Sequence, residues 1–352
     1  MSKVEHRDPE RIEIDGTSIV RGQRATIDLP VANLYTHMPL TMPVQVVRGR
    51  RAGPVLFVCA AIHGDEINGV EIIRRLLKHP ALNNLRGTLI TVPIVNVHGF
   101  LSMSRYLPDR RDLNRSFPGS ERGSVTARVA DRFVSQIVRQ ADYGIDLHTG
   151  ALHRPNLPQV RANLADAGTL AMARAFAAPV ILDSDLRPGS LREYATAQDI
   201  PMLLYEAGEA LRFDETCLRA GVRGVISVMR HVGMLPASRR KTVYRPLVAR
   251  ASQWVRAPGS GILRTLVALG ARVRKGQALG RVSDPFGEDE LAVTAPAGGL
   301  VIGRLNLPLV NEGDALFHIA RFESPSSAAE SVEQFRAQSQ EWLPLPGEQP
   351  IV

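Results

Sequence analysis

The sequence predicts an α/β fold with a largely parallel central sheet flanked by helices, followed by a small β domain. Continuous apolar runs alternate with segments of helical periodicity up to about residue 240. Beyond residues 240–250 the helical periodicity stops, and Gly, Val and Pro become frequent. Strands that alternate with helices are typical of βαβ units. The chain has 352 residues, a length that suits roughly two domains.

The first 50 residues contain short β segments, with polar and apolar residues alternating over Arg24–Leu29 and a second segment at Val44–Val47. Val55–Ile62 is then continuously apolar, as expected for a strand covered on both faces. Apolar residues at positions 70, 73, 76 and 77 have helical spacing. Thr88–Val95 is a further buried strand.

The next helix begins after Ser124, a good N-cap residue, and carries apolar residues at positions 125, 129, 133 and 137. Three apolar runs then predict further strands, at Tyr143–Leu147, Val180–Asp183 and Met202–Tyr205. We therefore expect residues 1–245 to form the α/β domain.

A weak internal repeat marks residues 246–322. The phrase that begins at Ala257 returns at Ala295, and each copy is followed by a Gly-containing turn. This stretch resembles the barrel-sandwich fold of biotinyl and lipoyl carrier domains. No lysine follows Lys275, so the hairpin between the copies has no residue for a prosthetic group, and a structural or assembly role is favoured. Residues 323–352 read as a polar helix with a Pro-rich tail.

Composition excludes several classes of function. The net charge is +8, but the arginines are dispersed and aromatic residues make up only 5%, so no nucleic-acid partner is expected. No apolar run reaches the ~18–20 residues of a membrane span. The polar N-terminus lacks a signal-peptide core and the two cysteines form no disulfide framework, so we expect a cytoplasmic protein.

Three short polar motifs directly follow apolar runs, and a fourth lies in a loop between two of them. The first three motifs contain His63 with Glu66, His148, and Glu206. Ligand sites in open parallel sheets form at the carboxyl ends of the strands. Catalytic zinc favours three His or carboxylate ligands and one open position. Together these residues predict a zinc hydrolase, with His63, Glu66 and His148 as candidate ligands.

Each motif alone also has a simpler interpretation. His63 and Glu66 could mark an ordinary helix start, and His148 could be a buried structural histidine. Asp146 lies on the same side of its strand as His148 and could orient the imidazole, or be a buried structural acid. Glu206 could be a general base beside the metal, or a salt-bridge partner of an arginine.

The loop at residues 112–119 carries Asn114 and Arg115, which could bind a carboxylate, although an ordinary loop with local hydrogen bonds is the alternative. Upstream, Arg105, Arg110 and Arg111 offer a cation that could stabilise an oxyanion.

The ordered combination of motifs resembles the succinylglutamate desuccinylase/aspartoacylase family, which is related to the zinc carboxypeptidases. The likeness runs from about residue 40 to 320. It is carried by His63-Gly-Asp-Glu66, Arg105, Asp112-Leu-Asn-Arg115-Ser-Phe-Pro-Gly, Asp146-Leu-His148-Thr-Gly and Tyr205-Glu206-Ala-Gly. The N-terminal segments and the lead-in to Asp112 look more like a broad bacterial subgroup that includes deacetylases of N-acetyl-diaminobutyrate.

The resemblance implies a zinc-carboxypeptidase-like fold with one zinc ion per chain, held by His63, Glu66 and His148. It also implies that Glu206 serves as general base for the attacking water and then protonates the leaving amine.

For the substrate, the resemblance implies that Asn114 and Arg115 bind the carboxylate and that Arg105 polarises the scissile carbonyl. Tyr205 could simply pack. His153, Arg154 and Arg161, just beyond His148, could contact the substrate or belong to a solvated loop.

These inferences predict a zinc-dependent hydrolase that removes an acetyl, succinyl or similar N-acyl group from an amino acid or small carboxylate. One alternative is a metallocarboxypeptidase that acts on small peptides, and another is a non-catalytic binding protein on the same scaffold. The expected partner is a small-molecule N-acyl amino acid, with no nucleic acid and no membrane. The β domain and the helical tail are compatible with a homo-oligomer.

Overall fold

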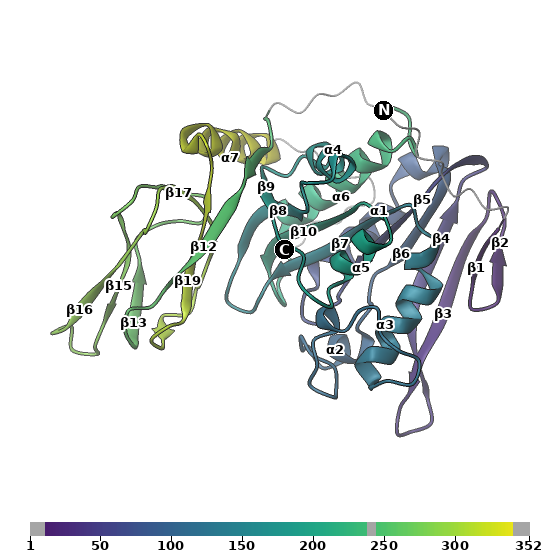
Figure 1. Ribbon diagram of the computed structural model, residues 1–352, viewed down its shortest axis with the longest axis horizontal. Helices are drawn as coiled ribbons and strands as arrows, with labels where there is room; N and C mark the ends of the chain where they lie inside the picture. The colour runs from purple at the N-terminus through teal and green to yellow at the C-terminus, as the bar shows by residue number, and fades with distance from the viewer. Residues whose placement is uncertain (1–10, 238–243, 341–352) are drawn as a thin grey trace.

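The computed structural model describes residues 11–237 and 244–340. The polar N-terminus and the Pro-rich end of the tail, both singled out in the sequence, lie outside the described residues. The described chain builds a large α/β body with a set of C-terminal strands beside it and a long helix, α7 (Pro325–Gln340), above them (Figure 1). No helix in this part of the chain has the length and apolarity needed to cross a membrane.

A 13-stranded sheet runs through the whole molecule. Its strands, in order of pairing, are β12 (Ala251–Arg256), β19 (Ala315–Arg321), β17 (Gly299–Arg304), β8 (Asn156–Ala162), β10 (Met202–Glu209), β7 (Tyr143–Gly150), β5 (Arg51–Ala60), β6 (Arg86–Val92), β4 (Pro39–Arg48) and β3 (Arg24–Asn33). Off this row, β9 (Val180–Asp183) pairs with β8 and with β11 (Leu247–Ala249), and β14 (Arg272–Val273) pairs with β17. A separate hairpin joins β1 (Ile12–Ile14) to β2 (Thr17–Ile19).

The sheet is mixed, with parallel pairing at its centre. Strands β6, β5, β7 and β10 are parallel neighbours, whereas β4 is antiparallel to β6 and β8 is antiparallel to β10. Parallel neighbours need a crossover, which helices provide between β5, β6 and β7. Only residues 151–155 separate β7 from β8, too few for a crossover, so β8 runs the opposite way. The sheet is therefore less parallel than expected: its parallel pairs are the four central strands and the short strands β8, β9 and β11.

Helices cover both faces of the α/β body (Figure 1). On one face α1 (Asn68–Leu77), α4 (Ala167–Phe176) and α6 (Glu215–His231) contribute to one buried apolar cluster, and on the other α3 (Val125–Gln136) and α5 (Leu191–Ala197) contribute to a second. The Ser124 hydroxyl accepts a hydrogen bond from the Ala127 N–H, which confirms the predicted N-cap. The shorter helices are α2 (Val97–Leu101), η1 (Pro80–Asn84), η2 (Leu113–Arg115) and η3 (Val138–Gln140).

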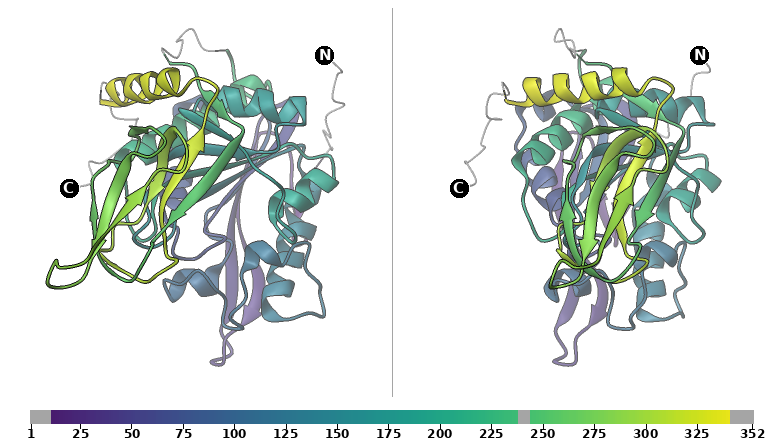
Figure 2. Two further views of the ribbon diagram at one scale, coloured as in Figure 1. Left: turned by 60° about the vertical axis from the view of Figure 1, so that its left-hand side comes forward. Right: turned by 90° about the vertical axis from the view of Figure 1, so that its left-hand side faces the viewer.

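The C-terminal strands form two layers around a third apolar cluster. One layer is β12, β19 and β17, and the other is the four-stranded sheet of β16 (Glu290–Thr294), β15 (Ala278–Ser283), β13 (Gly261–Thr265) and β18 (Leu309–Val310). Figure 2 shows these strands standing beside the α/β body. The likeness to carrier domains and the boundaries at residues 245 and 322 stay predictions.

Two contacts attach the C-terminal layer to the α/β body near the loop after β7. Gly303 of β17 pairs with Asn156 of β8, and the Asn306 N–H donates to the His153 carbonyl at 2.7 Å. A methyl group on Gly303 would lie 2.6 Å from the Asn156 side chain, so only glycine allows this close approach. The polar helix α7 also packs inward, with Phe335 buried against Tyr244.

The strands that carry the predicted site are longer than their apolar runs. β7 continues to Gly150 and β10 to Glu209, so His148 and Glu206 lie inside strands and not beyond their ends. Strand β8 was not predicted at all, because Asn156, Gln159 and Arg161 interrupt its apolar pattern. Polar residues can point into a pocket from within a strand, which hides the strand from a pattern search.

Candidate active site

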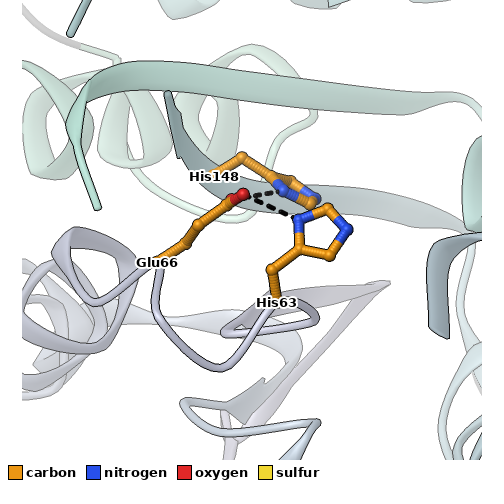
Figure 3. Close-up of side chains that lie close together, drawn as sticks. All are labelled: His63, Glu66 and His148. Atoms are coloured by element: carbon orange, nitrogen blue, oxygen red, sulfur yellow. Dashed lines mark hydrogen bonds and ion pairs between the residues drawn. The ribbon is translucent and has the colours of Figure 1, made fainter. Parts of the chain in front are cut away.

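The three predicted metal ligands lie together in the structure. His63 follows β5, Glu66 precedes α1, and His148 lies on β7, the parallel neighbour of β5. All three side chains are buried, and their ligand atoms all lie within 4.8 Å of one another. Figure 3 shows the three side chains turned toward one another. Residues 85 positions apart in the chain thus meet because β5 and β7 are paired.

The carboxylate of Glu66 lies between the two imidazoles. Its Oε1 is 2.7 Å from His63 Nδ1 and its Oε2 is 2.7 Å from His148 Nδ1. The Thr149 N–H donates a further hydrogen bond to Oε2 at 3.1 Å. Two imidazole nitrogens and one carboxylate oxygen around a common point are a donor set that catalytic zinc sites use.

Each imidazole has an aspartate behind it. His148 Nε2 lies 2.7 Å from Asp146 Oδ2, and His63 Nε2 lies 3.1 Å from Asp112 Oδ1. A carboxylate on the outer nitrogen fixes the ring and its tautomer, leaving the inner nitrogen for a metal. Both the candidate ligand atoms and the aspartates that hold the two imidazoles therefore suit a metal site. Asp112 received no role from the sequence, because it lies 49 residues from His63 and only folding brings them together.

The electrostatics of these groups are strongly coupled. Burial raises the pKa of Glu66, but the charges of His63 and His148 outweigh it and hold that pKa well below its usual range. Burial lowers the pKa of His148, whereas the charges of Asp146 and Glu66 raise it well above the ordinary value. The pocket thus concentrates negative charge around its imidazoles, which suits a divalent cation.

Arg105 lies beside the ligands and is about one-third exposed. Its guanidinium donates to Asp112 Oδ2 from Nη2 at 2.9 Å and from Nε at 3.2 Å. Its Nη1 is 3.4 Å from Glu66 Oε1 and 3.2 Å from His63 Nδ1. The aspartate behind His63 therefore also holds this cation at the edge of the ligand cluster.

Glu206 is the cross-strand neighbour of His148, because β10 pairs in parallel with β7 at this position. Its carboxylate forms an ion pair with Arg161 of β8, with Oε2 and Nε 2.5 Å apart. The sequence left open whether Glu206 faces the metal site or an arginine, and the structure places it beside both. Its role as general base stays a prediction.

Asn114 and Arg115 reach the same pocket from η2. The Asp112 carboxylate accepts a hydrogen bond from the Asn114 N–H at 2.8 Å and so holds the turn. Asn114 is buried, and its side-chain oxygen accepts from the Leu191 N–H at 3.0 Å. Arg115 is exposed, which leaves its guanidinium accessible from the pocket.

These residues line a pocket of about 280 Å³. Of the residues suggested by proximity, Arg154 and Arg161 line it, whereas His153 does not and instead donates its N–H to Glu209. Tyr205 is buried on the other face of β10, where its hydroxyl donates to the Cys217 carbonyl, so it packs and does not face the pocket. Several lining residues from other segments carried no sequence signal, among them Arg187, Arg192 and Trp254.

Comparison with known proteins identifies the family. Residues 52–232, about half of the chain, match the catalytic domain of the succinylglutamate desuccinylase/aspartoacylase family. The chain belongs to this family. The matched range includes the metal-ligand candidates, the two aspartates behind them and Glu206.

Relatives of this desuccinylase/aspartoacylase family member match most of its length. An N-α-acetyl-L-2,4-diaminobutyric acid deacetylase of Halomonas elongata is 29% identical over 313 residues, which is 85% of this chain and 91% of that protein. The product-bound ectoine utilization protein EutE (DoeB) of Ruegeria pomeroyi is 27% identical, with a TM-score of 0.76 over 85% of this chain and 94% of its own. A succinylglutamate desuccinylase/aspartoacylase of Rhodobacter sphaeroides is 25% identical, with a TM-score of 0.77 over 85% and 95%.

Proposed function

We propose that this protein is a zinc-dependent hydrolase that removes an N-acyl group from an amino acid or similar small carboxylate. The observation that carries the proposal is the convergence of His63, Glu66 and His148 on one point, with Glu206 on the neighbouring strand. The family and the deacetylase activity named for the Halomonas elongata relative support hydrolysis of an amide bond.

One zinc ion per chain would be held by His63 Nδ1, His148 Nδ1 and a carboxylate oxygen of Glu66. Asp146 and Asp112 would fix the two rings through their outer nitrogens. When bound, zinc lowers the pKa of water and polarises the scissile carbonyl as a Lewis acid.

The protein's own residues would carry the proton transfers. Glu206 takes a proton from the attacking water and later delivers it to the leaving amine nitrogen. Arg105, held by Asp112, presents a cation to the oxygen of the scissile carbonyl as negative charge develops there. Asn114 and Arg115 hold the substrate carboxylate and so orient the amide.

The dimensions of the site favour a small substrate over the metallocarboxypeptidase alternative. The pocket has a volume of about 280 Å³, near the lower end for small-molecule sites. Trp254 of β12 lines the pocket, so the C-terminal strands contribute to its wall. We infer that the predicted barrel-sandwich domain has a structural role, forming part of the pocket wall, and does not serve as a carrier.

The test is release of free amine from a panel of N-acetyl and N-succinyl amino acids by zinc-loaded and chelator-stripped protein. We expect zinc-dependent release from a narrow set of substrates and no cleavage of tripeptides. Turnover of peptides with silence across the panel would replace this proposal with the carboxypeptidase alternative.

The Glu206→Gln variant tests the assigned base. We expect a loss of about 10³-fold or more in kcat with zinc still bound at one ion per chain, because the amide cannot accept the proton. Glu121→Gln, on an exposed loop, is the matched control and should keep full activity. Substantial turnover by zinc-loaded Glu206→Gln would refute the role of Glu206.

A further inference from the structure

A second pocket lies at the opposite edge of the sheet from the candidate active site. His63 follows the carboxyl end of β5, whereas this pocket includes Arg51, with which β5 begins. At roughly 3.3 Å per residue of strand, the length of β5 separates the two sites by about 30 Å. The second pocket has a volume of about 750 Å³ and shares no lining residue with the first.

Four chain segments meet around this cavity, which we call the basic pocket. They are the start of β3 with the turn before it, the turn between β4 and β5, the end of η1 with the start of β6, and the segment after α6. Five arginines line it, namely Arg24, Arg48, Arg50, Arg51 and Arg86. The other described lining residues are apolar, glycine or asparagine, and no aspartate or glutamate is among them.

Backbone contacts hold the arginine-bearing segments against one another. The Gly49 N–H donates to the Gly87 carbonyl at 2.8 Å, and the Arg86 N–H donates to the Met234 carbonyl at 2.9 Å. A methyl group on Gly49 would lie 2.1 Å from the Leu85 carbonyl oxygen, so the turn between β4 and β5 needs glycine to lie this close to β6. The fold therefore fixes the backbone positions from which these arginines extend.

Two of the arginines are direct neighbours across a pair of strands. β5 pairs in parallel with β6, and the register places Arg51 opposite Arg86. Like charges in cross-strand positions destabilise a sheet. Because no acidic side chain lines this pocket in the described part of the chain, an anion from outside the protein is needed to balance the pair.

The arginines of the basic pocket differ in how they are held. Arg48 is buried, and its Nη1 donates to the Ile19 carbonyl at 2.7 Å, which fixes its side chain. The other four arginines are exposed, and within residues 11–237 and 244–340 none of their side chains forms an ion pair or a hydrogen bond. Their guanidiniums thus keep their donors available for a ligand.

We propose that the basic pocket binds a small polyanion that carries three or more negative charges on phosphate or carboxylate groups. Guanidiniums bind both kinds of group through paired, charged hydrogen bonds. An anionic group between Arg51 and Arg86 would replace their mutual repulsion with two attractions. The basic pocket uses no residue of the candidate active site, so this inference does not depend on the proposed function.

The size and lining of the basic pocket favour a small ligand over a nucleic acid. Its volume of about 750 Å³ lies within the range of small-molecule sites, roughly 300–1,000 Å³. Proteins that bind single-stranded nucleic acids stack the bases on aromatic side chains, and the described lining residues include no aromatic one. Recognition here would therefore rest on the charged groups of the ligand.

The test is isothermal titration of the full-length protein with inorganic tripolyphosphate and, separately, with citrate, at low ionic strength. We expect one of these polyanions to bind at one per chain and about tenfold or more tightly than inorganic phosphate or acetate, because it contacts several guanidiniums at once. The tighter of the two identifies the class of the anionic groups. Zinc content is measured before and after each titration, because both polyanions also bind zinc.

Paired substitutions assign the binding to the basic pocket. Arg51→Gln with Arg86→Gln should weaken binding by about 100-fold, since each lost charged partner costs about tenfold. Arg51→Lys with Arg86→Lys keeps the charges and should retain part of the affinity. Arg128→Gln with Arg274→Gln, two exposed arginines elsewhere, is the matched control and should bind as the wild type does. The glutamine pair should not lower Tm without ligand, because it removes a like-charge pair.

Four results would overturn the inference. Equal affinity for phosphate and tripolyphosphate would indicate an adventitious ion only, and equal weakening in the control pair would indicate an effect of net charge. Binding that is lost in Arg187→Gln but kept in the Arg51 and Arg86 glutamine pair would place the polyanion in the active-site pocket. Tighter binding of a single-stranded oligothymidylate than of either polyanion would indicate a nucleic-acid site. Amide hydrolysis is not measured here, so failure of the hydrolase proposal leaves these results unchanged.

Discussion

The two halves of the active-site pocket have opposite chemistry. The inner half places Glu66, Asp146 and Asp112 around two histidines, whereas the outer half places Arg161, Arg187 and Arg192 opposite one glutamate. Both halves lie on the same sheet, because Asp146, Leu204 and Arg161 are cross-strand neighbours on β7, β10 and β8. Carboxylates thus surround the imidazoles in one part of the pocket, and guanidiniums predominate in the adjacent part.

The buried histidines show what this difference does to the same side chain. His63 and His148 lie in the inner half, where burial lowers their pKa but neighbouring carboxylates raise it further, above the ordinary value. His318 of β19 lies near the outer half, where burial and the charges of Arg161 and Arg187 lower its pKa to about 3. The neighbours therefore decide whether a buried imidazole in this protein carries charge.

The largest expected effect comes from removing a candidate metal ligand in the inner half of the pocket. His148→Ala removes one of three ligands, and we expect zinc affinity to fall by about a thousandfold or more, with loss of turnover. Zinc content after dialysis and isothermal titration measure this. His231→Ala, at the exposed end of α6, is the control. Stoichiometric zinc retained by His148→Ala would contradict the ligand assignment.

The outer partners of the histidines should matter less than the ligands. Asp146→Asn keeps the shape but removes the charge behind His148, and we expect zinc affinity to fall by about 10- to 100-fold. Asp112 is more exposed and lies farther from its imidazole, at 3.1 Å against 2.7 Å, so Asp112→Asn should have a smaller effect. Competition with a chelating dye measures both, and the reverse order would show that Asp146 is only structural.

The low pKa of His318 predicts that its contribution to the free energy of unfolding is lost in acid. Its pKa is about 3 in the folded protein and about 6.5 when unfolded, so the unfolded chain binds more protons between these pH values. Its stabilisation is complete above pH 6.5 and is lost as pH falls, by about 2 kcal/mol at pH 5.

His318→Gln cannot take up this proton. Urea unfolding at pH 7 and pH 5 should therefore show a smaller acid loss for the variant than for the wild type. Equal losses would mean that His318 is not held neutral beside Trp254, on which it stacks with ring centroids 4.6 Å apart.

The smallest expected effect concerns the predicted carboxylate clamp. Arg115→Ala should raise KM by about tenfold for carboxylate-bearing substrates, because the exposed guanidinium donates charged hydrogen bonds that solvent partly replaces. The primary amide of the same substrate should lose much less. An equal loss on both would show that Arg115 does not bind the carboxylate.

Much of the fold and of the inner half could be predicted from sequence. The apolar runs identified β5, β7, β9 and β10, and the motifs named His63, Glu66 and His148, because ligands follow strands that meet at one edge. The polar residues of strand β8 hid this strand from the sequence pattern. The place of Arg161 in the pocket, beside Glu206, was hidden with it. Trp254 had no local signal, since it reaches the pocket only through the pairing of β17 with β8.

The sequence by itself determined the residue types, the strand and helix periodicity and the family likeness, because these depend on local spacing. Tertiary structure alone decided which side chains meet. Strand register placed Glu206 beside His148 of β7, where its carboxylate pairs with Arg161 of β8, and loop packing joined Asp112 to His63 across 49 residues. Such contacts arise from pairing between distant segments, whose alignment no local pattern contains.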